Sequence, residues 1–129
     1  MKTKKFNILL VEDDDSIRRS LAAFFEDYDI EVLEAENAEI GLEIFKEVKV
    51  DVMIVDLRLP GMSGEEFAQE VLKITDKVGI IIHTGSPQFE LSEELRRNKC
   101  VSNIIFEKPV KDLEEIRIEA ERLSKKCSK

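Results

Sequence analysis

The sequence is poor in the features that mark several classes of protein. Its 129 residues include only two cysteines and one histidine. Two cysteines without framework spacing exclude a disulfide-rich scaffold. No apolar run approaches the ~20 residues of a membrane-spanning helix, and the basic start leads directly into a strand-like run without the apolar core of a signal peptide. We therefore expect a bacterial-type cytoplasmic protein with reduced thiols and no membrane partner.

An excess of positive charge is also missing. The chain has 20 Lys and Arg residues against 28 Asp and Glu residues, which gives a formal net charge of -8. Because a protein that binds a phosphate backbone normally carries the opposite sign, direct nucleic-acid binding is disfavoured. Hydrophobic residues make up 43% of the chain, enough to bury a core. The length predicts one domain over residues 1–129, with residues 124–129 as a fraying helix end or the start of a linker.

Short apolar runs and amphipathic helical patterns alternate five times along the chain. The runs that predict strands are residues 6–11, 30–33, 50–55, 78–82 and 103–106. Helices are expected over 15–27, after the N-cap Asn37, after the capping box of Ser63 and Glu66, over 89–97, and after a second capping box of Asp112 and Glu115. This alternation is typical of a doubly wound α/β fold, in which helices cover both faces of a parallel sheet.

Polar residues follow four of the predicted strands at the point where each strand ends. Glu12 and Asp13 follow the first strand, Asp56 the third, Thr84 the fourth and Lys108 the fifth. In an open parallel sheet, ligands bind beyond the carboxyl ends of the strands, where the strand order reverses. In the flavodoxin-like order 2-1-3-4-5 the first and third strands are neighbours, so Glu12, Asp13 and Asp56 would converge.

Such a cluster of carboxylates has a chemical consequence. The groups repel one another, and one takes up a proton unless a cation lies among them. An all-oxygen site with few carboxylates suits Mg²⁺, whose coordination a phosphoryl group can complete. A carboxylate such as Asp56 can act as a nucleophile and form an aspartyl phosphate. Phosphoryl transfer needs a divalent ion, a fixed cation and a hydrogen-bond donor, which Asp13, Lys108 and Thr84 could supply, and the small Gly85 leaves room for the ligand.

Each feature taken alone also has an ordinary structural explanation. An acidic run before a helix usually caps it, as Asp14 or Asp15 would here. A single Asp, Thr or Lys at a strand end is more often a turn, structural or solvated residue. Their occurrence together at one edge of a sheet favours a functional site. His83 should face the other side of its strand as a packed histidine, and Cys100 and Cys127 show no metal or redox motif and are expected to be inert thiols.

Four stretches of sequence carry a resemblance to a known family. They are ILLVEDDDSIRRSL, VDVMIVDLRLPGMSG, IIIHTG and FEKPV, all between residues 8 and 110. With them the chain resembles the receiver (phosphoacceptor) domain of two-component response regulators. The resemblance implies a five-stranded flavodoxin-like (βα)5 fold that takes a phosphoryl group from the phosphohistidine of a histidine kinase or a phosphotransfer protein. It also implies self-catalysed phosphorylation and dephosphorylation without turnover of a substrate, and an output face of helix 4, strand 5 and helix 5 through which family members often form homodimers when phosphorylated.

The resemblance also implies roles for individual residues. Asp56 is similar to the phosphorylated aspartate, and Thr84 and Lys108 to the switch hydroxyl and the lysine that pair with the phosphoryl group. The bond from Lys108 to Pro109 would be cis. The implied ligands of Mg²⁺, or of Mn²⁺, are Asp13 directly, Glu12 through water, Asp56, and the backbone carbonyl of Arg58.

The chain departs from the family pattern at two positions. Receivers usually carry Tyr or Phe three residues before the lysine, as the second switch residue, but this position is Ile105 and Phe106 comes one place later. Either the aromatic switch is absent or the strand carries a bulge. Arg58 places a long cation two residues after the acceptor, and we hypothesise that it changes the lifetime of the phosphoryl group.

Three other functions remain to be considered. A phosphatase or phosphotransferase with an aspartyl nucleophile, like the haloacid-dehalogenase phosphatases, would carry a second Asp two positions after the nucleophile, where this chain has Arg58. A degenerate receiver that serves only as a docking module would not need the intact set of Glu12, Asp13, Asp56, Thr84 and Lys108. A flavin-binding flavodoxin would need a Ser/Thr/Gly-rich phosphate loop after the first strand, which is missing.

Overall fold

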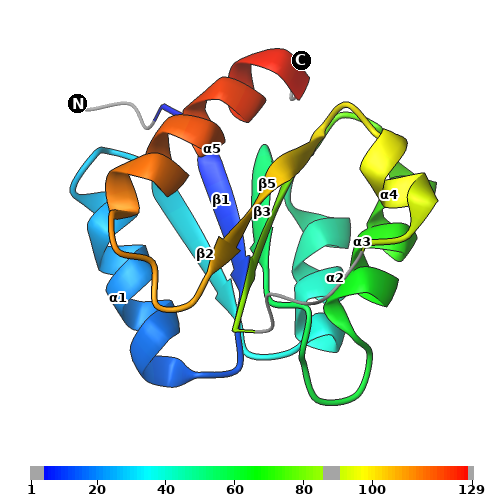
Figure 1. The fold of residues 1–129 in the computed structure, drawn as a ribbon, viewed down its shortest axis with the longest axis horizontal. Helices are drawn as coiled ribbons and strands as arrows, with labels where there is room; N and C mark the ends of the chain where they lie inside the picture. Colours follow the sequence, from blue (N-terminus) through cyan, green and yellow to red (C-terminus); the bar gives the residue numbers. More distant parts are fainter. Residues whose placement is uncertain (1–4, 86–90, 128–129) are drawn as a thin grey trace.

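The apolar runs form one parallel sheet in the computed structural model of the chain, which describes residues 5–85 and 91–127. Its strands are β1 (Asn7–Val11), β2 (Glu31–Ala35), β3 (Val52–Val55), β4 (Gly79–Thr84) and β5 (Val101–Glu107). All neighbouring strands are parallel, and their order is β2-β1-β3-β4-β5. The predicted doubly wound order 2-1-3-4-5 is therefore confirmed, and the carboxyl ends of the strands point to the lower edge of Figure 1.

The helices begin where the sequence offers caps. They are α1 (Asp15–Glu26), α2 (Ala38–Glu47), α3 (Gly64–Ile74), α4 (Glu93–Arg97) and α5 (Leu113–Cys127). The side chain of Asp14 caps α1, and Ser63 and Glu66 form both bonds of the predicted capping box. Among the described residues, no helix has the length and apolar character that crossing a bilayer requires.

The start of α4 differs from the expectation, and α5 starts where expected but with a different capping hydrogen bond. Ser92 caps α4, so this helix starts at Glu93 and not at residue 89, and residues 89 and 90 lie outside the described residues. At α5, the Asp112 carboxylate accepts the N–H of Glu114 at 3.0 Å, whereas the N–H of Glu115 reaches the Asp112 carbonyl at 3.2 Å. Asp112 therefore precedes α5 as predicted, but its carboxylate accepts the N–H of Glu114 in place of the Glu115 N–H that the predicted capping box requires. The last two residues of the expected tail 124–129 also lie outside the described part.

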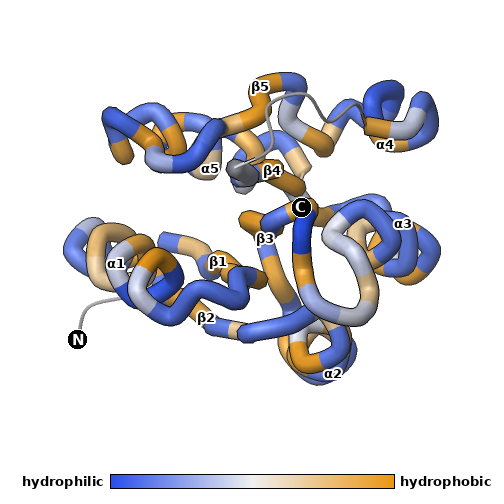
Figure 2. Tube along the Cα trace, turned by 60° about the horizontal axis from the view of Figure 1, so that its bottom comes forward, coloured by the Kyte–Doolittle hydropathy of each residue, from blue (hydrophilic) through white to orange (hydrophobic). Residues whose placement is uncertain are grey.

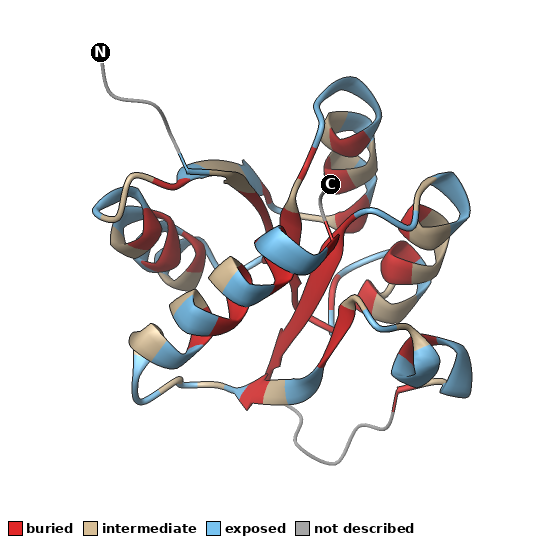
Figure 3. Cartoon of the chain, turned by 90° about the horizontal axis from the view of Figure 1, so that it is seen from above, coloured by how far each residue is buried: buried red, intermediate tan, exposed pale blue. Residues whose placement is uncertain are grey.

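Alternating side chains of the strands build two cores, one on each face of the sheet. Leu9 and Val11 face α2, α3 and α4 and pack in one core with Phe67. Ile8 and Leu10 face α1 and α5 and join a second core. The central strands β1, β3 and β4 are buried almost throughout, whereas the edge strands β2 and β5 are buried only in part. Figure 2 shows orange, apolar stretches along the strands, and Figure 3 shows helices that are buried only along their inner sides. This packing fixes the strand ends, and with them the loops at the lower edge of Figure 1.

Strand β5 carries a bulge next to β4. Ile80 pairs with Val101 and Ile82 with Ile105, so two steps along β4 correspond to four along β5. The bulge lies before Ile105, which packs against the core of α2, α3 and α4, whereas Phe106 packs in the opposite core. Both parts of the expectation therefore apply: the strand is bulged, and Phe106 still does not take the position of the aromatic switch.

The expectation of inert, reduced thiols is wrong in this structure. Cys100 and Cys127 form a disulfide, with their Cα atoms 5.9 Å apart. Cys100 directly precedes β5 and Cys127 ends α5, which returns along the sheet to the start of that strand (Figure 1). A sequence separation of 27 residues without a motif does not reveal this proximity, because it arises only when α5 packs on the sheet.

Candidate functional site

Three carboxylates meet at the carboxyl ends of β1 and β3. Glu12 and Asp13 follow β1, and Asp56 follows β3, its neighbour in the sheet. One carboxylate oxygen from each of the three residues lies within 4.8 Å of the others. Glu12 and Asp56 are only 3% and 6% exposed, whereas Asp13 is exposed at the rim. The structure thus forms an acidic cluster, which we define as Glu12, Asp13 and Asp56, with one side open to solvent.

A lysine from the loop after β5 enters this cluster. The Nζ atom of Lys108 lies 2.5 Å from Oε1 of Glu12 and donates a hydrogen bond of 2.7 Å to Oδ2 of Asp56. The Lys108–Pro109 bond is cis, as expected. The backbone N–H of Lys108 donates to the carbonyl of Thr84 at 2.9 Å, which links the ends of β4 and β5. Thr84 itself is fully buried at the end of β4.

The cluster resists carrying its full negative charge. Burial raises the pKa of the Glu12 carboxyl, although the ammonium of Lys108 acts in the opposite direction. Burial also disfavours the charged form of Lys108, but its bonds to Asp56 and Glu12 outweigh this effect and raise the pKa of the ammonium. Burial thus works against the charged form of Glu12, and a cation added to the cluster would relieve the repulsion between the carboxylates.

These residues fit a hard divalent cation. Their donor atoms are carboxylate oxygens, which Mg²⁺ and Mn²⁺ prefer, and Asp13 lies at the exposed rim where water can complete the coordination. The buried Oε1 of Glu12 accepts no hydrogen bond from the described residues, although Lys108 lies beside it as an ion pair. The ammonium of Lys108 is thus the one partner of this oxygen among the described residues, and a divalent cation, or a water molecule on it, could share this oxygen or take the place of the ammonium.

Backbone geometry around Asp56 holds its carboxylate in place. The N–H of Arg58 donates to Oδ1 of Asp56 at 3.0 Å, so each oxygen of this carboxylate has a donor. Gly64 packs against the backbone of Asp56: a Cβ atom at residue 64 would lie 2.1 Å from the Asp56 carbonyl oxygen. Nothing local in the sequence reveals this close approach. The side chain of Arg58 is exposed beside the cluster.

A buried arginine that the sequence analysis missed supports the loop of Glu12. Arg18 is 7% exposed, and its guanidinium donates to the carbonyl of Glu12 at 2.9 Å, to Glu34 at 3.1 Å and to Asp15 at 2.5 Å. It therefore joins the β1–α1 loop to α1 and to β2. The signal was present in the sequence, because Arg18 stands one helical turn before the core residue Leu21, on the apolar side of α1.

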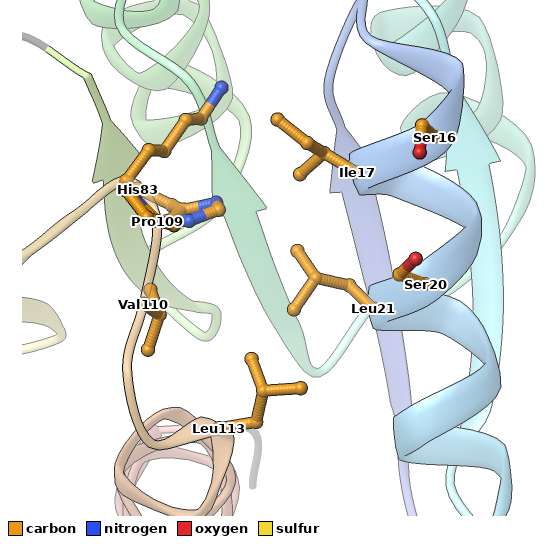
Figure 4. A pocket seen from close by; sticks show the side chains of 9 residues that line it. Ser16, Ile17, Ser20, Leu21, His83, Pro109, Val110 and Leu113 are labelled. Atoms are coloured by element: carbon orange, nitrogen blue, oxygen red, sulfur yellow. The ribbon is translucent and has the colours of Figure 1, made fainter.

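A mostly apolar pocket of about 350 Å³ adjoins the cluster and shares Lys108 with it. It lies between α1 and the loop that joins β5 to α5, and Figure 4 shows Ile17 and Leu21 facing Pro109 and Leu113 across it. His83 also lines this pocket, on the opposite side of β4 from Thr84, and is only 4% exposed. The expectation of a packed histidine is confirmed. Burial and the nearby ammonium of Lys108 lower the pKa of His83 from 6.5 to about 4.

Comparisons with known proteins point in one direction. The family model of the response regulator receiver domain matches residues 8–119. The regulatory protein AtoC of Escherichia coli (strain K12) is 30% identical over 115 residues, which cover 89% of this chain but 24% of AtoC. Sporulation initiation phosphotransferase F of Bacillus subtilis (strain 168) is 28% identical over 110 residues, which cover 85% of this chain and 86% of that protein.

Solved structures agree with the sequence comparisons. The response regulator protein TrrA from Thermotoga maritima, crystallised in complex with Mg²⁺-BeF, matches with a TM-score of 0.79 at 25% identity, over 92% of this chain and 98% of that one. The chain spans only about a quarter of AtoC, so it corresponds to one part of that longer protein.

Proposed function

Because the chain belongs to the response regulator receiver domain family, we propose that it is a signalling phosphoacceptor whose acceptor is Asp56. One observation carries the proposal: Asp56 lies at the strand-order reversal together with Glu12, Asp13 and Lys108. The donor would be the phosphohistidine of a histidine kinase or of a phosphotransfer protein, in the cytoplasm. Residues 1–129 would form one receiver domain, which neither turns over a small-molecule substrate nor contacts nucleic acid itself.

The chemistry follows from the surroundings of Asp56. Its carboxylate oxygen attacks the phosphorus, an O–P bond forms, and the N–P bond of phosphohistidine breaks, so that the imidazole leaves with the electron pair. The ammonium of Lys108, now paired with Oδ2 of Asp56 at 2.7 Å, would move with the transferred group and neutralise its oxygens. Thr84 at the end of β4 would supply a hydroxyl donor to the same group.

A divalent ion fits the acidic side of this site. Asp13 and Asp56 would hold Mg²⁺ or Mn²⁺ directly, Glu12 would hold it through water, and the backbone carbonyl of Arg58 would complete the protein ligands. Once bound, the ion supplies charge neutralisation for the attacking carboxylate and the phosphoryl oxygens. The raised pKa of Glu12 supports this assignment, because the cluster gains stability from an added cation.

Output would pass through α4, β5 and α5. An aspartyl phosphate would bias a two-state equilibrium by attracting Thr84, and this movement would reach α4 and β5 beside it. Ile105 packs on the same core as α4, where the family carries an aromatic residue. The switch would therefore work through the small repacking of an aliphatic side chain, and a phosphorylation-dependent homodimer would use this face.

Phosphorylation by a small donor tests the assignment of the acceptor. We expect the protein to gain one phosphoryl group, seen by intact-mass spectrometry, from acetyl phosphate or phosphoramidate with Mg²⁺, and to gain none after chelation with EDTA. Asp56→Asn should abolish the modification. The exposed Asp76→Asn, the same change on the surface, should leave it intact. An unmodified wild type with Mg²⁺ would favour a docking module, and steady hydrolysis of a generic phosphate ester would favour a phosphatase.

The pocket beside Lys108 gives the protein donor a place to dock. Its apolar lining from α1 and the β5–α5 loop lies next to the atoms that meet the phosphoryl group, so a donor that reaches Asp56 from this side would cover it. Ile17→Ser should slow transfer from a phosphorylated kinase but not from acetyl phosphate. The control Ile74→Ser alters an isoleucine of α3 that is 52% exposed and should change neither rate. Equal slowing with both donors would contradict the docking role.

A further inference from the structure

The C-terminal half of α5 is fastened to the sheet at three points, and one of them is covalent. Leu123 approaches Gly79 so closely that a Cβ at residue 79 would lie 2.6 Å from its own Cβ. The Ser102 hydroxyl donates to the buried carboxylate of Glu119 at 2.5 Å. The disulfide of Cys100 and Cys127 then joins the start of β5 to the last turn of α5 (Figure 1).

The two cysteines are held unequally. Cys100 is fixed on the sheet, because its N–H donates to Asn98 at 2.8 Å and its carbonyl accepts the N–H of Ile80 at 2.8 Å. Cys127 is the last residue of α5, and helix ends open more readily than helix centres even where they pack on a core. The covalent bond therefore restrains mainly one partner, the end of α5.

Cys100 is the member of the pair that solvent can reach for thiol–disulfide exchange. Cys100 is partly exposed, whereas Cys127 is 5% exposed and packs in the core of α1 and α5. From these observations we propose that Cys100 and Cys127 are a redox-responsive thiol pair, whose oxidation locks the end of α5 to β5. The pair would give the domain a covalent input that is independent of the phosphoryl group.

The exchange balances with oxidised glutathione as the oxidant. The accessible thiolate of Cys100 attacks one sulfur of glutathione disulfide and expels the first reduced glutathione. The thiolate of Cys127 then attacks the Cys100 sulfur, forms the intramolecular bond and expels the second reduced glutathione. Two protein thiols are oxidised and one glutathione disulfide is reduced to two thiols.

The end of α5, which the disulfide restrains, lies beside the bulged strand β5. Ser102 also accepts the N–H of Ile104 at 3.1 Å within the bulge of β5, so the bulge and α5 are joined through Glu119. Ile104 on β5 and Ile118 on α5 are 49% and 59% exposed. Oxidation would therefore fix the relative position of two exposed apolar side chains on neighbouring elements.

Redox titration followed by hydrogen exchange tests the proposal. The full chain is equilibrated at several ratios of reduced to oxidised glutathione, quenched in acid, alkylated and weighed by mass spectrometry. We expect a change from a doubly alkylated to an unalkylated species without a lasting glutathione adduct. In the oxidised form, amides of residues 119–127 should exchange at least ~10-fold more slowly, while those of α1 stay unchanged. The midpoint of thermal unfolding should rise by ~10 °C.

A matched variant separates the disulfide from other effects of the oxidant. Cys100→Ser combined with Cys127→Ser should show the same exchange in both redox buffers. Thiols that remain reduced in excess oxidised glutathione, a reaction that stops at the glutathione adduct, or equal exchange of α5 in the two redox forms would overturn the proposal. None of these measurements involves Asp56, so their failure would leave the proposed phosphoacceptor function standing, and the reverse also holds.

Discussion

Acidification should destabilise the protein through His83. This residue is the only histidine of the chain and is 4% exposed. Burial, followed by the charge of Lys108, lowers its pKa from 6.5 to about 4, and the carboxylate of Asp56 opposes this only in part. In the unfolded chain the imidazole has its ordinary pKa, so the unfolded state takes up a proton first as the pH falls.

The magnitude follows from the two pKa values. A histidine whose folded pKa is depressed stabilises the native state fully above its unfolded pKa, and this contribution disappears as the pH falls from 6.5 towards about 4. At a pH near the folded value, the loss in the free energy of unfolding amounts to about 3 kcal/mol. For a domain of this size, this is a substantial share of the total stability.

Urea unfolding at a series of pH values measures this loss. Carboxylates titrate in the same range, so the wild type is compared with His83→Leu, in which their contribution remains and that of the imidazole is removed. The variant should lose about 3 kcal/mol less than the wild type between neutral pH and about pH 4. The single imidazole also gives one unambiguous NMR titration. An NMR pKa near its ordinary value, or parallel losses of stability in the two proteins, would refute the reasoning.

Three further substitutions probe the residues around the acidic cluster. Arg18→Gln should weaken Mg²⁺ binding by ~10-fold in calorimetry, because the guanidinium of Arg18 no longer holds the loop after β1. The control Arg19→Gln changes an exposed arginine and should leave Mg²⁺ binding unchanged. Gly64→Ala should lower the free energy of unfolding, measured in urea, by at least about 2 kcal/mol, since its Cβ would meet a backbone oxygen at 2.1 Å. In the control Gly85→Ala the new Cβ meets nothing within 4 Å, and the free energy of unfolding should stay nearly unchanged. Arg58→Ala should change the rate at which the phosphorylated protein loses its phosphoryl group, and a rate equal to that of the wild type would contradict the hypothesis.

The sheet could be predicted because its signals are local. The apolar runs and the caps at Asp14, Asn37 and Ser63 gave the elements, and the rule for parallel sheets gave their order. The meeting of Glu12 with Asp56 also followed from that order, since the carboxyl ends of neighbouring parallel strands share one edge.

Features that depend on packing between distant elements could not be predicted. The bulge of β5 shows only when its pairing with β4 is known, and it moved the start of the strand from residue 103 to Val101. The disulfide arises from the way α5 returns over the sheet to Cys100. The close approach of Gly64 to Asp56 is likewise a contact between a helix start and a strand end, which local sequence patterns do not predict.

The central claim is that the acidic cluster prepares one carboxylate to accept a phosphoryl group. Locating that group is the most direct test: after reaction with acetyl phosphate and Mg²⁺, borohydride reduction converts an aspartyl phosphate to homoserine, which peptide mass spectrometry assigns to a residue. The account predicts conversion at Asp56 alone. Conversion at Asp13, a phosphate found on His83, or no conversion at any aspartate would contradict it.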